Sequence, residues 1–161
     1  FKTFENYLKQ FEIFINSIEK NGTLVYNELD PELKKLVSSN KSNLNYIPYS
    51  IPKHNIIDGI SFIDINDELY RLKIFGEQNL QNISGALNIC KALGVESEDF
   101  YNAITSFNGA SNRLELVYKS SDTIIFKDFA HSPSKVKATT EAVRKQFSNR
   151  KLISFFELSE K

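Results

Sequence analysis

The sequence lacks methionine and tryptophan altogether, and it has a single cysteine, Cys90, among its 161 residues. One cysteine excludes a disulfide bond within the chain, which suits a reducing compartment. We therefore expect a cytoplasmic protein. Because methionine is missing even at position 1, we also expect the chain to be a piece of a longer protein, which would carry only part of an active site.

An excess of charge of either sign is also missing. Twenty Lys and Arg residues balance twenty Asp and Glu residues, so the formal net charge at neutral pH is zero. This balance argues against a strongly basic, nucleic-acid-binding protein. No apolar run approaches the roughly 18 residues that a membrane-spanning helix requires, and no basic region precedes an apolar run at the amino terminus. We expect neither a nucleic-acid partner nor a membrane partner.

The composition that is present is that of an ordinary globular protein, with 41% hydrophobic and 25% charged residues. Apolar residues recur at three- and four-residue steps in some segments and form short β-rich runs in others, which predicts an α/β fold. The predicted helices cover residues 4–19, 31–37, 79–93, 98–107 and 134–147. The predicted strands cover residues 23–26, 44–50, 60–65, 69–75, 114–118, 123–127 and 152–156.

A turn-forming segment, residues 107–112, interrupts this pattern and predicts a domain boundary. The two parts on either side are residues 1–110 and 111–161. In the second part, a strand, a helix of about 14 residues and another strand outline a βαβ unit with parallel pairing of its strands.

The first candidate site begins at Gly76, which leaves a predicted strand and enters a helix holding Asn79 and Asn82. Residues three apart share one face of a helix, so the two amides could face one flat heterocycle such as adenine. Asparagine at the start of a helix more often acts as a cap. The residues alone leave both interpretations open.

The second candidate site is Arg113, which lies at the predicted boundary and is followed by Glu115. A guanidinium group is always charged and offers a planar set of donors that suits phosphate or carboxylate. The alternative is an ordinary surface ion pair between Arg113 and Glu115 or another acid.

The third candidate site, residues 128–134, lies between a predicted strand and a predicted helix, where ligands bind in open α/β sheets. Asp128 could accept hydrogen bonds from ribose hydroxyls, and His131 could donate to phosphate or act near neutral pH. The alternative is that Asp128 and Ser134 are loop and helix-cap residues.

In this order, segments 76–82, 113–115 and 128–133 resemble motifs of the Mur ligase family, the ATP-dependent amide ligases that assemble peptidoglycan stem peptides. The family typically carries a G-x-H-N-x-x-N element opening a helix, an Arg-x-Glu element, and a D-Y/F-A-H-x-P element. The resemblance covers most of the chain. It implies the back half of the central ATP-binding domain joined to the first part of a Rossmann-like C-terminal domain.

The resemblance also implies the chemistry, which is transfer of the ATP γ-phosphate to a carboxylate and attack of an amine on the acyl phosphate. Asn79 and Asn82 would bind adenine, Asp128 the ribose, and Arg113 the phosphates or the ribose side of the nucleotide. His131 would be a further nucleotide contact. The implied partners are ATP or ADP, with Mg²⁺, UDP-N-acetylmuramate and a murein peptide in the complete enzyme. No catalytic residue and no metal ligand is assigned in this chain.

Within the family, residues 128–135 are most like the members that join L-alanyl-γ-D-glutamyl-meso-diaminopimelate to UDP-N-acetylmuramate in peptidoglycan recycling. The members that add L-alanine more often have a second histidine where Ser132 stands, and they are the alternative. Gln78 replaces the family's usual histidine, and none of the six glycines precedes a lysine as the phosphate loop requires. We therefore expect this chain alone to be inactive. A noncatalytic, ligase-like module that binds a partner protein is a further alternative.

Overall fold

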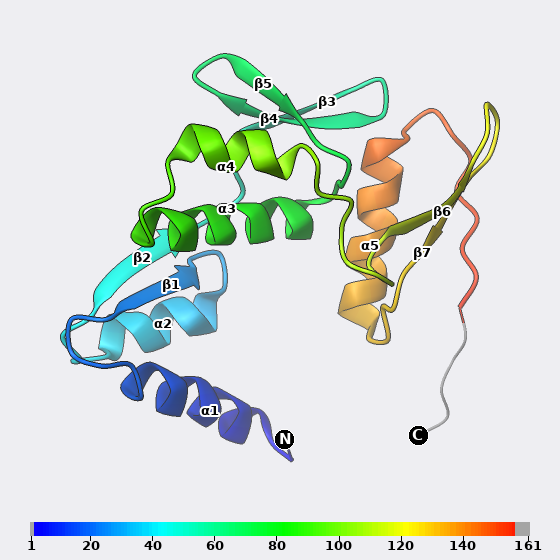
Figure 1. Cartoon of the computed structure of the whole chain (residues 1–161). Coiled ribbons are helices and arrows are strands. Elements are labelled where there is room, and N and C mark those ends of the chain that lie inside the picture. The colour runs from blue at the N-terminus through cyan, green and yellow to red at the C-terminus, as the bar shows by residue number, and fades with distance from the viewer. Residues whose placement is uncertain (1, 157–161) are drawn as a thin grey trace. The chain divides into compact units, whose positions relative to one another are not determined.

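The computed structural model of the chain describes residues 2–156. Its helices are α1 (Phe4–Asn16), α2 (Pro31–Ser39), α3 (Glu77–Ala92), α4 (Ser97–Ile104) and α5 (Pro133–Gln146). Its strands are β1 (Thr23–Asn27), β2 (Asn45–Tyr49), β3 (His54–Ile57), β4 (Ile60–Ile65), β5 (Glu68–Arg71), β6 (Glu115–Lys119) and β7 (Ile124–Lys127). Figure 1 traces these elements, which confirm a mixed α/β fold. The chain divides into two compact units: the first unit is residues 1–52 and 80–101, and the second unit is residues 53–79 and 102–161.

The first unit is built on two parallel strands, β1 and β2, which pair over all five residues of each. Parallel neighbours need a crossover connection, and α2 supplies it. This helix begins where the sequence predicts, because the Asp30 carboxylate accepts hydrogen bonds from two backbone amides of the first turn. Pro31 occupies the first helical position, where its missing N–H costs nothing.

From Leu80 onward, α3 packs in the first unit. Leu80 is only 1% exposed. A Cβ atom added to Gly85 would lie 3.1 Å from the ring of Tyr49, so glycine permits a close approach of this helix to the end of β2. The amide of Asn27, at the end of β1, donates to Gln81 Oε1 on α3 at 3.2 Å. The helix is therefore joined to the strand pair by apolar and neutral polar contacts.

The second unit begins with an antiparallel sheet in the order β3-β4-β5. Its two hairpin turns each hold two residues with positive φ, Asp58-Gly59 and Asn66-Asp67. This is the geometry of tight two-residue hairpins. The structure confirms the predicted hairpin at Asn66-Asp67. Strand β3 was not predicted, because its polar first residues, His54 and Asn55, hide the β pattern.

Aromatic side chains form the centre of the second unit. Phe75 lies edge-on to both Phe126 of β7 and Phe147, with ring centroids 5.1 Å and 5.8 Å apart. Beside them, the hydroxyl of Ser61 on β4 donates to Gln146 Oε1 of α5 at 2.9 Å, and both residues are buried. The antiparallel sheet and α5 are thus packed as one core.

The predicted strand over residues 152–156 is wrong, and so is the predicted βαβ unit. Residues 151–156 have no regular structure, and β7 pairs with β6, antiparallel, with an irregularity between Leu116 and Tyr118. A β-rich segment becomes a strand only when a neighbouring strand takes up its backbone hydrogen bonds. None of the described residues does this for residues 152–156.

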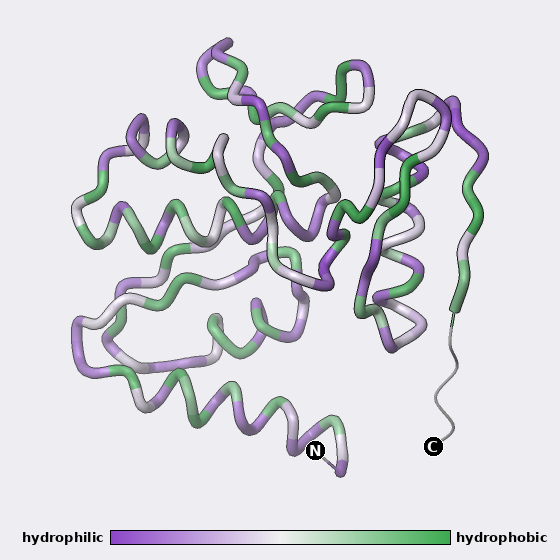
Figure 2. Tube along the Cα trace, turned by 45° about the vertical axis from the view of Figure 1, so that its right-hand side comes forward, coloured by the Kyte–Doolittle hydropathy of each residue, from purple (hydrophilic) through white to green (hydrophobic). Residues whose placement is uncertain are grey.

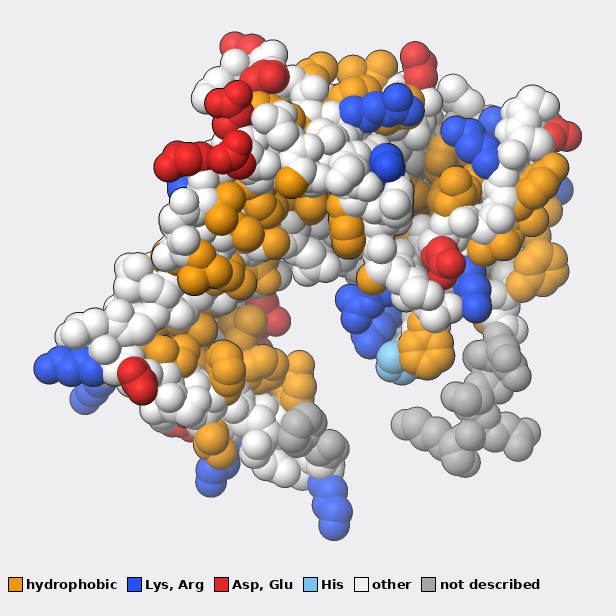
Figure 3. Space-filling model, viewed as in Figure 1, with side chains coloured by type: hydrophobic (Ala, Val, Ile, Leu, Met, Phe, Trp, Pro, Cys, Tyr) orange, Lys and Arg blue, Asp and Glu red, His pale blue; other side chains and the backbone are white. Residues whose placement is uncertain are grey.

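Hydrophobic and hydrophilic residues alternate along the helices rather than forming long apolar runs (Figure 2). Among the helices of residues 2–156, none is both long enough and apolar enough to span a bilayer. On the face shown in Figure 3, acidic side chains gather at the upper left, whereas basic side chains are scattered over the surface.

Candidate functional site

Gly76 forms a tight turn between Phe75 and α3 in the second unit. Its φ is +91°, and a Cβ atom at this position would lie 3.0 Å from Ala142 Cβ of α5. The next residue, Glu77 of α3, forms an ion pair with Lys145 of α5. Only glycine satisfies both the backbone and the packing here, so the start of α3 is fixed against α5.

Asn79 lies in the first turn of α3, and its side-chain amide donates to the Phe75 carbonyl at 2.8 Å. The Oδ1 atom has no hydrogen-bond partner among residues 2–156 and remains an acceptor for a ligand. Asn82 is exposed one turn later in the same helix. The division between the units falls between Asn79 and Leu80, so Asn82 is counted with the first unit.

Arg113 is exposed, and its guanidinium group makes no ion pair within the described part of the chain. The predicted alternative, a pair with Glu115, does not form. The Glu115 carboxylate instead accepts a hydrogen bond from the Asn112 backbone amide at 2.7 Å and another from the Ser111 hydroxyl at 3.3 Å. The Asn112 amide is the main reason that the pKa of Glu115 is lowered.

Asp128 connects the second and third candidate sites. Its Oδ1 accepts from the Leu114 backbone amide at 2.9 Å, and its Oδ2 accepts from the Thr139 hydroxyl of α5 at 2.8 Å. The backbone amide of Phe129 also donates to the Asn112 carbonyl at 2.8 Å. These bonds hold the two loops side by side. Each carboxylate oxygen of Asp128 keeps a further lone pair for a ligand hydroxyl.

His131 is exposed at the start of α5. Its Nδ1 lies 3.0 Å from the Phe129 carbonyl oxygen, and its Nε2 lies 3.5 Å from Lys135 Nζ. A ring held through Nδ1 presents Nε2 outward. The predicted cap residue of this helix, Ser134, is not the cap, because Ser132 occupies the N-cap position and Pro133 follows it. The N-cap shifts because proline is suited to the first helical position.

Four of the five predicted site residues therefore belong to the second unit: Asn79, Arg113, Asp128 and His131. Thr139 is the contributor that sequence reasoning missed. It contacts Asp128 across eleven residues of chain, and no local pattern marks that contact. The arrangement combines a free guanidinium, a carboxylate with spare lone pairs, an imidazole and an amide oxygen. These groups suit a ligand with phosphates, hydroxyls and a heterocycle.

The described residues include no group of three or more His, Cys, Asp or Glu side chains that could hold a metal ion.

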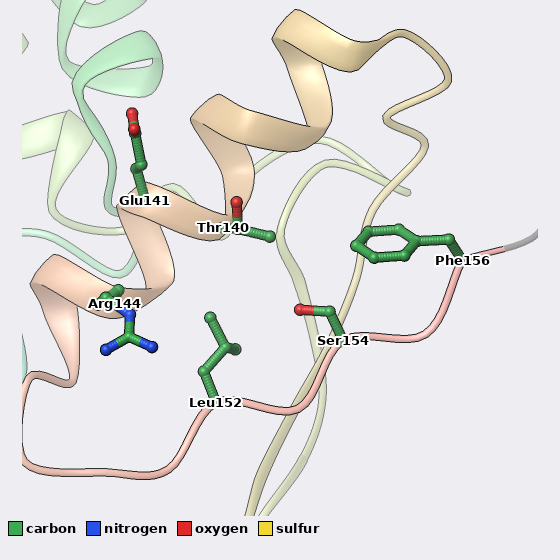
Figure 4. Close-up of a pocket in the computed structure, with 6 residues that line it drawn as sticks. All are labelled: Thr140, Glu141, Arg144, Leu152, Ser154 and Phe156. Carbon is green, nitrogen blue, oxygen red and sulfur yellow. The ribbon is translucent and has the colours of Figure 1, made fainter.

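A cavity of about 340 Å³ lies elsewhere in the second unit (Figure 4). It is lined by Thr140, Glu141 and Arg144 of α5 and by Leu152, Ser154 and Phe156 of the irregular segment that follows. None of these residues belongs to the three candidate sites. Thr139, which holds Asp128, is also absent from this lining.

No protein-family model matches the chain. Curated relatives are similar to it over nearly its whole length. The UDP-N-acetylmuramate–L-alanine ligase of Caldicellulosiruptor bescii is 32% identical over 98% of this chain and 37% of its own length. That of Persephonella marina is 29% identical over 98% of this chain and 36% of its own length. The chain thus spans little more than a third of these relatives.

Solved structures share the fold. The UDP-N-acetylmuramoylalanyl-D-glutamyl-2,6-diaminopimelate–D-alanyl-D-alanyl ligase of Acinetobacter baumannii covers 88% of this chain and 34% of its own length, with a TM-score of 0.71 and 18% identity. The alanine ligase MurC of Thermotoga maritima covers 92% of this chain and 35% of its own, with a TM-score of 0.66 and 16% identity. The murein peptide ligase of Psychrobacter arcticus covers 91% of this chain and 33% of its own length, with a TM-score of 0.61 and 20% identity.

Proposed function

Because sequence relatives and structural neighbours both support the Mur ligase family, we propose that this chain carries nucleotide-contacting residues of an ATP-dependent amide ligase of peptidoglycan synthesis. We also propose a domain boundary near residue 110, which differs from the division into compact units. Residues 1–110 form part of the central domain, and residues 111–161 form part of the C-terminal domain.

The observation that carries this proposal is the pair of hydrogen bonds between the second and third candidate sites. The amide of Leu114 donates to Asp128, and the amide of Phe129 donates to the Asn112 carbonyl. Two motifs separated by more than ten residues are thereby held together, with the exposed guanidinium of Arg113 beside them. A phosphate group suits that cation, and a ribose hydroxyl suits the remaining lone pairs of Asp128.

Each residue has a separate proposed task. The amide oxygen of Asn79 and the amide of Asn82 bind the adenine ring, Asp128 accepts from the ribose, and Arg113 neutralises phosphate charge. His131 is a further nucleotide contact through Nε2, which is the acceptor of the neutral ring because Nδ1–H donates to the Phe129 carbonyl. Phosphoryl transfer depends mainly on positioning and on neutralising charge, and this is what these residues supply. ATP brings the phosphate that activates the substrate carboxylate, and the amine then attacks the acyl carbon with loss of phosphate.

The amine substrate is proposed from the relatives. The relatives at 32% and 29% identity are named for L-alanine, whereas the murein peptide ligase is a structural neighbour at 20% identity. The L-alanine ligase, predicted as the alternative from the sequence, is therefore the better-supported reaction. The predicted tripeptide ligase of peptidoglycan recycling is its competitor. Comparing kcat/KM for L-alanine and for the tripeptide, with UDP-N-acetylmuramate and ATP, decides between them in the complete enzyme.

Calorimetric titration of the complete enzyme with ADP tests the nucleotide site. We expect Asn79→Ala and Asp128→Asn each to weaken ADP binding about tenfold, because each removes one or two hydrogen bonds to the ligand. Glu12→Gln is a control, since Glu12 is exposed on α1 and makes no ion pair within residues 2–156. Unchanged ADP affinity in both site variants would overturn the residue assignments. Absence of ADP binding by the unaltered enzyme would overturn the function itself.

A further inference from the structure

Arg113 lies between two residues in the left-handed region of backbone conformation. The φ of Asn112 is +56°, and the φ of Leu114 is +47°. Asparagine adopts this conformation readily, but leucine does so rarely because its Cβ crowds the backbone. A backbone of this kind persists only where neighbouring groups hold it.

Three hydrogen bonds hold the three consecutive backbone amides of this loop. The Asn112 amide donates to the Glu115 carboxylate at 2.7 Å. The Arg113 amide donates to the Ala110 carbonyl at 3.2 Å, and the Leu114 amide donates to Asp128 Oδ1 at 2.9 Å. Two of the three acceptors are therefore carboxylates, which make stronger bonds to amides than neutral acceptors do.

The Glu115 carboxylate is used by the backbone and not by the neighbouring guanidinium. Its second contact is the hydroxyl of Ser111, and the strand register places Lys127 directly opposite it. The Glu115 carboxylate thus has two hydrogen-bond donors, and neither is Arg113. The guanidinium stays exposed and keeps its donors for a ligand.

We propose that Glu115 is a positioning residue: its carboxylate holds the loop at Asn112, so that Arg113 presents its guanidinium to the phosphates of the nucleotide. This inference rests on the proposed nucleotide-binding function. It assigns the acid of the Arg-x-Glu pair a task distinct from pairing with its arginine. Loss of Glu115 should therefore weaken binding of phosphates and leave binding of the nucleoside unchanged.

The test is a set of calorimetric titrations of the complete enzyme with adenosine, AMP, ADP and ATP. We expect Glu115→Gln to weaken ADP and ATP binding about tenfold and to change adenosine binding less than about twofold. In an Arg113→Ala background, Glu115→Gln should cause little further loss, because a residue that acts through another is not additive with it. Glu12→Gln, the same chemical change at an exposed position of α1, should change nothing.

Two results would overturn the inference while leaving the function standing. One is an equal loss of adenosine and ADP affinity in Glu115→Gln, and the other is additive losses in the double variant. Ser111→Ala is the milder second variant if Glu115→Gln does not fold. It removes the 3.3 Å donor to Glu115 and the 3.4 Å acceptor of the Asn112 side-chain amide, and it should weaken ADP binding about twofold with adenosine binding unchanged. No nucleotide binding by the unaltered enzyme would instead remove the proposed function.

Discussion

The two compact units use different kinds of polar contact. In the first unit, neutral amides and hydroxyls join distant segments, as in Asn40 with Asn16, Asn43 with Asn21, and Asn27 with Gln81. In the second unit, carboxylates do so: Asp64 pairs with Lys53, Glu77 with Lys145, and Asp128 accepts from Leu114 and Thr139. The three contacts named in the first unit are neutral, whereas the three named in the second unit each include a carboxylate. Four of the five candidate site residues lie in the unit with the carboxylate contacts.

The largest expected effect tests how much close packing, as distinct from polar contacts, contributes to the stability of the second unit. Gly76→Val places a side chain where a Cβ already meets Ala142 at 3.0 Å, at a φ of +91°. We expect a loss of about 3 kcal/mol in the free energy of unfolding, measured by denaturant titration.

The matched control for this prediction is Gly94→Val in the first unit. Gly94 has a φ of +85°, but no atom lies within 4 Å of an added Cβ. Only the backbone cost remains, about 1 kcal/mol. Equal losses at Gly76 and Gly94 would mean that contact with α5 contributes nothing.

An intermediate effect concerns the one buried neutral contact described in the second unit. Ser61→Ala leaves the buried amide of Gln146 without its partner, so we expect a loss of about 2 kcal/mol in the free energy of unfolding. Because neither group titrates in acid, the loss should be the same at about pH 6 and about pH 4. Thr105→Ala, which removes an exposed hydroxyl contact, is the control. A pH-dependent loss at Ser61 would contradict this explanation.

The smallest expected effect is the pH dependence of the second unit. The pKa of Asp64 is lowered, chiefly by its hydrogen bond from Lys53, and that of Glu115 chiefly by the Asn112 amide. A carboxylate with a lowered folded-state pKa contributes stability that is fully present above its ordinary value, 3.8 for Asp and 4.5 for Glu. That contribution is lost as the pH falls through the lowered values. Acid should therefore open the second unit before the first.

Hydrogen exchange, corrected for its intrinsic pH dependence, measures this difference between β3–β5 and β1–β2. The double variant Asp64→Asn with Glu115→Gln should reduce this difference in acid sensitivity between the two units. Asn27→Ala in the first unit should leave the difference unchanged. Equal acid sensitivity of the two units would contradict the expectation that acid opens the second unit before the first.

The sequence predicted the elements whose signals are local. Asp30-Pro31 marked the start of α2, and Asn66-Asp67 marked a hairpin that the structure contains. Strand β3 was missed because its first residues are polar, and the wrong strand at 152–156 shares a further cause with it. A strand exists through pairing with another segment, and pairing is not written in its own residues.

The candidate site likewise has some features that the sequence predicted and others that only the structure revealed. The residue types and their order supported a nucleotide-binding hypothesis, because guanidinium, carboxylate and amide groups have fixed bonding capacities. The sequence by itself thus determined the candidate chemistry and the α/β class. Only the tertiary structure decided that Glu115 bonds to the Asn112 amide rather than to Arg113, and that Thr139 holds Asp128. The reason is physical: a hydrogen bond depends on distance and direction in space, and both are set by how separate segments pack.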